Sequence, residues 1–248
     1  MLEMFISKIR SIELIQLRSI KKRYSTLTVL DNVSFEISAG DFFALLGPNG
    51  AGKTTIIRIL LDFTRADSGE ALIKGISSRL PAARKGIGYL PENINLPLYL
   101  SGRDYLQRHA RLSDLIGKEA EIAIDRVLET VGMKSRQRSR CGTYSKGMMQ
   151  RIGLAASLIV TPQILILDEP TNGLDPIGIR EFRMILESLR GQGITLFLNS
   201  HILSEVERIC DTAAIMDKGS LLVKDEIPNL LHEGETLEDV FIRLINKE

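Results

Sequence analysis

Residues 47–55 read Gly-Pro-Asn-Gly-Ala-Gly-Lys-Thr-Thr, a spacing of glycine, lysine and hydroxyl side chains that can hold a chain of phosphate groups. Glycines let successive backbone N–H groups curve around phosphate oxygens, and a helix that begins next adds the positive end of its dipole. The pattern G-x-x-x-x-G-K-[ST] binds nucleotides when a strand precedes it and a helix follows. Here the apolar run 42–46 precedes it and the helix-like run 56–61 follows, so nucleotide binding is predicted.

Two side chains at the end of this loop have separate expected roles. Lys53 would reach the β and γ phosphates and offset their charge during catalysis, while the Thr54 hydroxyl would ligate Mg²⁺. A glycine turn beside an ordinary surface lysine is the alternative, which the flanking strand and helix disfavour. The loop alone does not separate kinases, GTPases, recombinases and transport ATPases. The predicted nucleotide contacts in it are Gly47, Pro48, Asn49, Gly50, Ala51, Gly52, Lys53, Thr54 and Thr55.

A pair of acids, Asp168 and Glu169, directly follows the apolar run 164–167. A buried strand can present an acid at its carboxyl end, where α/β sheets bind ligands. Asp168 would then hold Mg²⁺ through water, and Glu169 would polarise the water that attacks the γ-phosphate. Two solvated acids at the start of a turn are the alternative. The apolar run and the upstream phosphate loop disfavour it.

The elements that must position these residues alternate between strands and helices. Runs 42–46 and 164–167 are apolar throughout, as expected for central strands buried on both faces. Such alternation predicts an α/β fold with a largely parallel sheet covered by helices. The expected strands are residues 12–17, 33–37, 42–46, 86–90, 164–167, 195–199, 212–216 and 220–223.

Between about residues 97 and 160, helical signals replace the strand pattern. Ser101 and Asp104 have the spacing of a capping box, and apolar residues recur at helical spacing over residues 124–131. This stretch therefore predicts a helical insert. Residues 236–248 carry a further apolar stripe, which predicts a final helix.

The composition is that of a globular chain without a strong electrostatic field. Of 248 residues 44% are hydrophobic, enough for a large core, and 32 basic residues face 31 acidic ones. The formal charge of +1 gives no reason to expect nucleic acid as a partner. The two cysteines have no metal-ligand spacing, which favours a reducing compartment. The first ten residues lack the apolar stretch of a signal peptide, and the longest apolar run, 152–160, is too short to cross a bilayer.

Residues 144–151 read Tyr-Ser-Lys-Gly-Met-Met-Gln-Arg and resemble the signature segment of the ABC ATPase family, usually Leu-Ser-Gly-Gly-Gln. Ser145 and Gly147 match that pattern, whereas the other three positions depart from it. A serine and exposed amides at a helix start form an anion site. The resemblance implies that Ser145 and Gly147 bind the γ-phosphate of an ATP held by a second copy of the chain, in a head-to-tail dimer.

Three other segments support the same resemblance. Residues 173–175, Gly-Leu-Asp, are similar to the family's D-loop, which lies along the dimer seam. His201, at the end of a strand, is similar to the switch histidine that contacts the γ-phosphate, so it joins Lys53 and Glu169 as a catalytic candidate. Tyr24 resembles the aromatic residue that stacks on adenine. In isolation, a histidine would more often be an ordinary surface or core residue, and a tyrosine would decide nothing.

Glu92 stands where many members of the family carry the glutamine of the Q-loop, which bridges metal, water and the membrane subunit. Its carboxylate could also ligate Mg²⁺, so the expected metal ligands are Thr54, Glu92 and Asp168. This departure, together with Pro176 and residues 237–241, resembles the ABC-2 type exporter branch of the family.

The resemblance spans nearly the whole chain and therefore carries a complete fold with it. It implies a P-loop NTPase (RecA-like) core with a mostly parallel sheet, an antiparallel β subdomain and an α-helical insert subdomain. Residues 8–235 would form the ATPase cassette, with the insert at about 97–160, and residues 236–248 would form the C-terminal helix.

The implied function is hydrolysis of ATP, with Mg²⁺, to power transport through a separate membrane permease. The chain would be cytoplasmic and peripheral on the inner face of the cell membrane through that permease, with a second copy of itself as partner and no nucleic acid. A non-transport ABC ATPase is the alternative, but such relatives usually have two cassettes or a long coiled coil, and this sequence shows neither. A P-loop kinase would need a substrate lid and has no use for Ser145 or His201.

Overall fold

The computed structural model describes residues 13–246, and within that range the strands form two sheets. The larger sheet has the order β10-β9-β3-β8-β7-β6 and is parallel except for β10. Its strands are β3 (Phe42–Leu46), β6 (Ile87–Leu90), β7 (Ile164–Asp168), β8 (Thr195–Asn199), β9 (Thr212–Asp217) and β10 (Ser220–Glu226). The predicted parallel sheet is therefore confirmed. Residues 8–12 of the expected cassette, including the expected strand start Ile12, and residues 247–248 of the expected last helix lie outside the described range.

The smaller sheet is antiparallel throughout, with the order β2-β1-β4-β5. Its strands are β1 (Glu13–Tyr24), β2 (Leu27–Ser38), β4 (Ser68–Ile73) and β5 (Ile76–Ser77). β1 and β2 extend well beyond the expected runs 12–17 and 33–37. Their additional residues pair in a largely exposed hairpin, and the sequence does not reveal this extension because it lacks apolar alternation there. β4 and β5 are absent from the sequence prediction, since half of β4 is exposed and β5 is very short.

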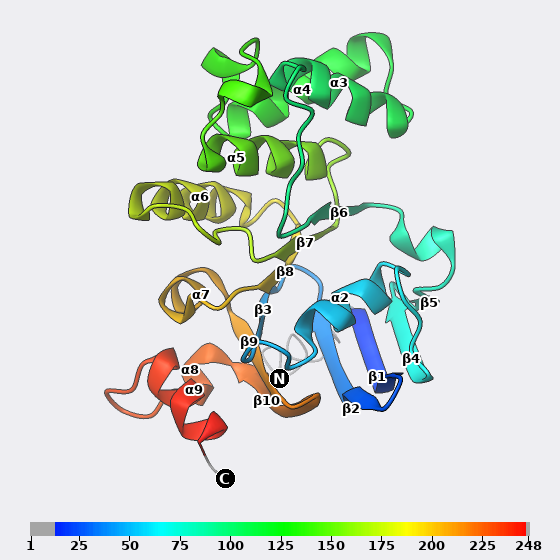
Figure 1. Cartoon of the computed structure of the whole chain (residues 1–248), viewed down its shortest axis with the longest axis vertical. Coiled ribbons are helices and arrows are strands. Elements are labelled where there is room, and N and C mark those ends of the chain that lie inside the picture. Colours follow the sequence, from blue (N-terminus) through cyan, green and yellow to red (C-terminus); the bar gives the residue numbers. More distant parts are fainter. Residues whose placement is uncertain (1–12, 247–248) are drawn as a thin grey trace, which may run out of the picture.

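Some helices cover the larger sheet, and others form a group at one end of the molecule. α3, α4 and α5 pack together at that end (Figure 1). Ser101 begins α3 with the predicted capping box to Asp104, and Thr236 forms a second box with Asp239 at the start of α9. No helix within residues 13–246 is long and apolar enough to cross a membrane. The helices are α2 (Lys53–Leu60), α3 (Gly102–Leu112), α4 (Gly117–Thr130), α5 (Lys146–Ser157), α6 (Pro176–Leu189), α7 (Leu203–Ile209), α8 (Ile227–Leu230) and α9 (Leu237–Ile245).

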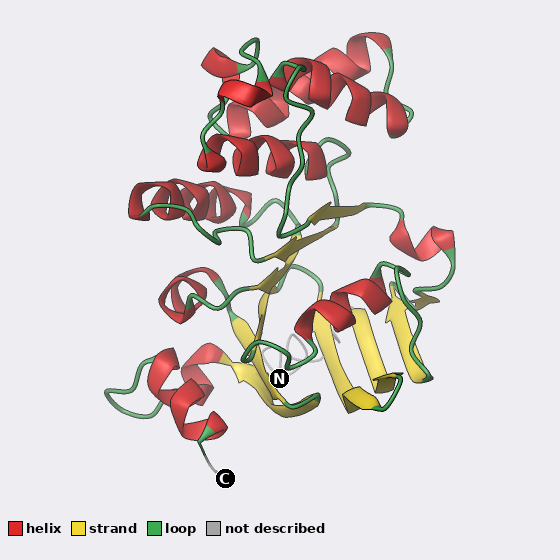
Figure 2. Ribbon diagram, viewed as in Figure 1, coloured by secondary structure: helices red, strands yellow, loops and turns green. Residues whose placement is uncertain are grey.

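Side chains on the two faces of the larger sheet enter two different cores. Along β3, Phe42, Ala44 and Leu46 face one way and Phe43 and Leu45 the other, because successive side chains of a strand alternate. The first face packs against α5 to α9, and the second against α2 and the smaller sheet (Figure 2). All five side chains are buried, as predicted for a central strand.

The parallel strands bring polar residues from distant parts of the chain to one edge of the larger sheet. The glycine-rich loop follows β3, Asp168 ends β7, Asn199 ends β8, and Glu92 lies just beyond β6. In the strand register Asn199 is level with Asp168 on one side and with Leu45 on the other. Because α/β sheets bind ligands at the carboxyl ends of their parallel strands, a ligand site is expected at this edge.

Candidate active site

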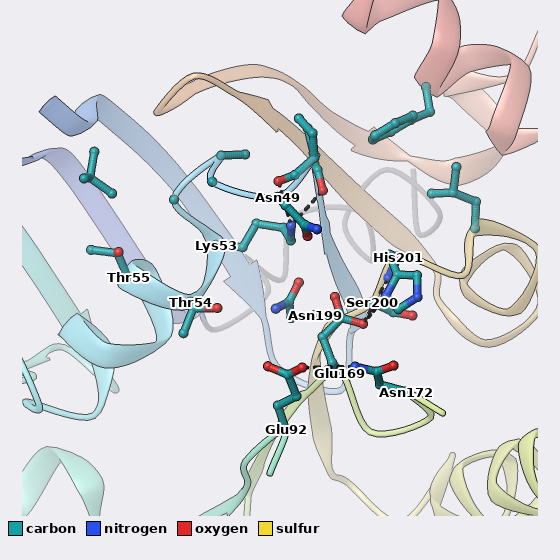
Figure 3. A pocket seen from close by; sticks show the side chains of 18 residues that line it. Asn49, Lys53, Thr54, Thr55, Glu92, Glu169, Asn172, Asn199, Ser200 and His201 are labelled. Atoms are coloured by element: carbon teal, nitrogen blue, oxygen red, sulfur yellow. Dashed lines mark hydrogen bonds and ion pairs between the residues drawn. The ribbon is translucent and has the colours of Figure 1, made fainter. Parts of the chain in front are cut away.

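A pocket of about 670 Å³ lies at this edge, and Figure 3 shows the side chains around it. The loops after β3, β6, β7 and β8 form its walls, and β2, α2, α7 and α9 add further residues. Of the predicted site residues, the pocket is lined by Gly47, Pro48, Asn49, Gly50, Ala51, Gly52, Lys53, Thr54, Thr55, Glu92, Glu169 and His201. The other lining residues are Val29, Asn172, Asn199, Ser200, Leu203 and Phe241.

Two glycines give the phosphate loop its shape. The backbone angle φ is +84° at Gly50 and +103° at Gly52, values that residues with a side chain rarely adopt. At Gly52 a Cβ atom would also lie 2.5 Å from Leu30 Cδ2 and 2.8 Å from the Val29 carbonyl oxygen, well inside van der Waals contact. The loop therefore curls tightly against β2 before α2 begins at Lys53. Such a curl can turn backbone N–H groups toward an anion.

Gly52→Ala is expected to weaken nucleotide binding by about tenfold or more, because the added methyl group must displace Leu30 or the loop itself. Gly50→Ala is the matched control, since it also has a positive φ but its Cβ would meet nothing within 4 Å. Equilibrium titration with a fluorescent ATP analogue measures both variants. Equal losses would show that backbone conformation, and not the contact with Leu30, makes glycine necessary at these positions.

The Lys53 side chain folds back over the loop from the first residue of α2. Its Nζ donates hydrogen bonds to the carbonyl oxygens of Gly47 at 2.7 Å and Pro48 at 3.1 Å, and the residue is only 7% exposed. Burial lowers the pKa of Lys53, against the opposing effect of the charges on Glu169 and Asp168. A desolvated ammonium group of this kind is stabilised by an anionic ligand.

Asp168 lies at the end of β7 and is 4% exposed. Its Oδ1 accepts a hydrogen bond from Asn199 Nδ2 at 2.6 Å. Burial raises the pKa of Asp168; the bond from Asn199 opposes this shift and the nearby charge of Glu92 adds to it. Asp168 does not line the pocket itself, a depth compatible with the predicted role through water. Asn199 was not among the predicted site residues, although its place at a strand end near His201 is the signal that could have found it.

Glu169 and His201, both predicted to be catalytic, are in direct contact (Figure 3). His201 Nδ1 lies 2.6 Å from Glu169 Oε2, and the His201 backbone N–H donates to the same oxygen at 3.3 Å. Glu169 has a φ of +49°, an uncommon conformation for a residue with a side chain and one that clusters at functional sites. Burial raises the pKa of Glu169, while the hydrogen bond and charge of His201 oppose the shift. A carboxylate with a raised pKa is a better proton acceptor.

Glu92 and Asn172 meet at the pocket from two different loops. Asn172 Nδ2 donates a hydrogen bond to Glu92 Oε1 at 3.0 Å (Figure 3). Glu92 was a predicted site residue and Asn172 was not, because Thr-Asn-Gly has the composition of an ordinary turn.

Three predicted nucleotide contacts lie outside this pocket. Tyr24 ends β1, is 44% exposed, and its hydroxyl lies 3.4 Å from Thr64 Oγ1. Ser145 and Gly147 lie at the start of α5, where Ser145 Oγ accepts a hydrogen bond from the Met148 N–H at 3.2 Å. The structure therefore does not bring these three residues to the pocket of their own chain.

Val29, Leu203 and Phe241 add apolar surface to the pocket. They come from β2, α7 and α9, elements that are far apart in the sequence. They were not among the predicted site residues, because an apolar side chain in an apolar stripe is already explained by packing.

Comparison with known proteins identifies the family. The family model described as ABC transporter matches residues 30–172. The chain is 45% identical over 219 residues to the uncharacterised ABC transporter ATP-binding protein YhcH of Bacillus subtilis, covering 86% of this chain and 71% of that protein. It is 39% identical over 228 residues to the lantibiotic transport ATP-binding protein SrtF of Streptococcus pyogenes, covering 92% and 96%. The chain spans only 62% and 60% of the length of two other relatives it matches.

A solved ATP-binding subunit of an ABC transporter has the same fold, with a TM-score of 0.84 and 27% identity, covering 94% of this chain and 100% of that one. This likeness and the two observed sheets confirm the predicted α/β P-loop NTPase fold. A family match over more than half of the sequence, on a fold of the same kind, shows that the chain belongs to the ABC transporter family, in which it is an ATP-binding, ATP-hydrolysing subunit.

Proposed function

We propose that this chain powers export of a substrate through a separate membrane permease. The observation that best supports ATP hydrolysis is that Lys53, Glu169 and His201 line one pocket. Relatives named for lantibiotic transport, bacitracin transport and Nod factor export support the transport part. Glu92 in place of the usual Q-loop glutamine supports the ABC-2 type branch.

The pocket fits a nucleoside triphosphate with Mg²⁺. The glycine loop and the buried ammonium group of Lys53 are groups that bind phosphates. Thr54 and Glu92 line the same pocket and offer oxygen atoms, the ligand type that Mg²⁺ prefers. Asp168 adds a carboxylate behind them. Bound Mg²⁺ would neutralise charge on the phosphates.

Lys53, Glu169 and His201 have different roles in ATP hydrolysis. Lys53 offsets negative charge on the phosphates as it develops in the transition state. Glu169, held by His201 through two contacts to one carboxylate oxygen, is the group that polarises the attacking water. His201 is 56% exposed at its side chain and so can also face a γ-phosphate in the pocket.

The residues of the signature segment act on the pocket of a second copy. Ser145 and Gly147 lie apart from the pocket of their own chain, at a helix start that can bind an anion. Lys146 lies against Gly173, where a Cβ atom would be 2.3 Å from its Nζ, so the signature and the D-loop form one continuous surface. Two chains arranged head to tail would bring each such surface to the other's ATP.

The isolated chain is expected to be mostly monomeric without nucleotide and to dimerise around two ATP molecules. Light scattering on the Glu169→Gln variant, which should hydrolyse ATP only slowly, would show the mass double when ATP and Mg²⁺ are added. Ser145→Arg should abolish the increase, because a bulky side chain would enter the shared site. An unchanged mass with saturating ATP would count against a site shared between two copies.

The permease is the partner that the transport proposal requires. It would hold the chain at the inner face of the cell membrane, with residues 8–235 as the cassette, the helical insert at about 97–160, and residues 236–248 as the C-terminal helix. Affinity purification from solubilised membranes should recover an integral membrane protein with the chain. Recovery of ribosomes or DNA instead would favour a non-transport ABC ATPase.

A further inference from the structure

Asn172 makes hydrogen bonds to two separate parts of the active site. Its backbone N–H donates to the Glu169 carbonyl oxygen at 3.1 Å, which closes the turn that follows the acid pair. Its side-chain Nδ2 donates to Glu92 Oε1 at 3.0 Å, across 80 residues of sequence. The residue is half-buried and lines the pocket. Asn172 therefore connects Glu92 to the turn that follows Glu169.

The hydrogen bond between Asn172 and Glu92 requires one orientation of the asparagine amide. A carboxylate oxygen only accepts hydrogen bonds, so the amide nitrogen must face Glu92 and the amide oxygen must point away. Glu92 is otherwise exposed, on the loop between β6 and α3, and Asp168 and Glu169 place two further carboxyl groups near it. Like charges repel, and an exposed glutamate without a partner would turn toward solvent. The Asn172 amide opposes that movement.

We propose that Asn172 is a positioning residue that holds the Glu92 carboxylate at the nucleotide pocket, where it contributes to binding of the divalent cation that accompanies ATP. The inference rests on the proposed role of Glu92 at the metal. In this proposal, Asn172 acts only through Glu92 and contacts neither the cation nor the phosphates.

The test measures binding of Mn²⁺, as a probe for Mg²⁺, to the full chain saturated with a non-hydrolysable ATP analogue, by electron paramagnetic resonance. Asn172→Leu removes the donor at similar size and without a change of charge. It is expected to raise the Mn²⁺ dissociation constant about three- to tenfold, the loss expected for one partly exposed hydrogen bond. Asn172→Gln, which keeps the donor on a longer side chain, should retain more affinity. Asn93→Leu, the same change at an exposed neighbour of Glu92, is the matched control and should bind Mn²⁺ as the wild type does.

A double-mutant cycle separates positioning from a direct role. In the Glu92→Ala background, Asn172→Leu should cause no further loss, because there is no carboxylate left to hold. The same loss in both backgrounds would show that Asn172 acts on the cation or nucleotide by itself, and would overturn the inference. So would wild-type affinity in the single variant. Failure of the wild-type chain to bind Mn²⁺ with the nucleotide would instead refute the proposed metal site as a whole.

Discussion

Glu169→Gln is expected to lower ATP hydrolysis by about 10²–10⁴-fold, the contribution typical of a general base, while leaving ATP binding intact. The substitution keeps the shape of the side chain and removes the charge that polarises water. Glu169 is suited to this role because it follows a buried strand and is fixed by two contacts to His201. The variant should therefore accumulate as an ATP-bound dimer.

Glu92→Gln provides the comparison, because Glu92 is the other acid that lines the pocket. Glutamine can still accept the hydrogen bond from Asn172, so this variant should retain a much larger share of the activity. Steady-state phosphate release and nucleotide titration on both variants measure the difference. If hydrolysis survives Glu169→Gln and collapses in Glu92→Gln, the assignment of the base is wrong.

The pH dependence of hydrolysis follows from the same assignment. Burial raises the pKa of Glu169, and only its deprotonated form can polarise water. The rate should therefore fall as the pH drops through this raised pKa, at a higher pH than an exposed glutamate would require. A pH–rate profile of the wild type should show this acidic limb, and the residual activity of Glu169→Gln should lack it.

Lys53→Ala is expected to lower hydrolysis by about 10²–10³-fold, the loss typical when one group that stabilises transition-state charge is removed. The side chain is buried within the loop, where its Nζ donates a hydrogen bond to the Gly47 carbonyl oxygen. ATP affinity should fall as well, since the cation meets the phosphates in the ground state too. Phosphate release and nucleotide titration report the two effects, and wild-type turnover in this variant would refute the phosphate-loop assignment.

The sequence predicts those site residues that belong to a motif of neighbouring residues, and not those whose role depends on a partner far away in the sequence. Lys53 could be assigned because its glycine-rich loop has a fixed spacing between an apolar run and a helix, and Glu169 because the acid pair directly follows an apolar run. The hydrogen-bond partners of Asn199 and Asn172 could not be predicted, because they lie 31 and 80 residues away and an asparagine near a turn is common. Which side-chain amide meets which carboxylate is decided by the register and the loops of the folded sheet.

The same contrast holds for the fold. β3 and β7 could be predicted because a short unbroken apolar run bounded by turn residues is typical of a strand buried on both faces of a sheet. β4 and the outer halves of β1 and β2 have few buried residues, and they are strands because neighbouring backbones pair with them. Pairing of that kind depends on tertiary context, which intrinsic strand propensity does not contain.

The order of strands in the larger sheet has a consequence for how the chain is made. β3, which leads into the phosphate loop, lies between β8 and β9, and both are synthesised long after it. Until residues 195–217 have left the ribosome, the backbone of β3 has neither of its ladder partners. Such long-range pairing slows folding and leaves an early apolar segment exposed to aggregation. A nascent fragment that stops before β8 therefore contains every residue of the phosphate loop and lacks both strands that pair with β3.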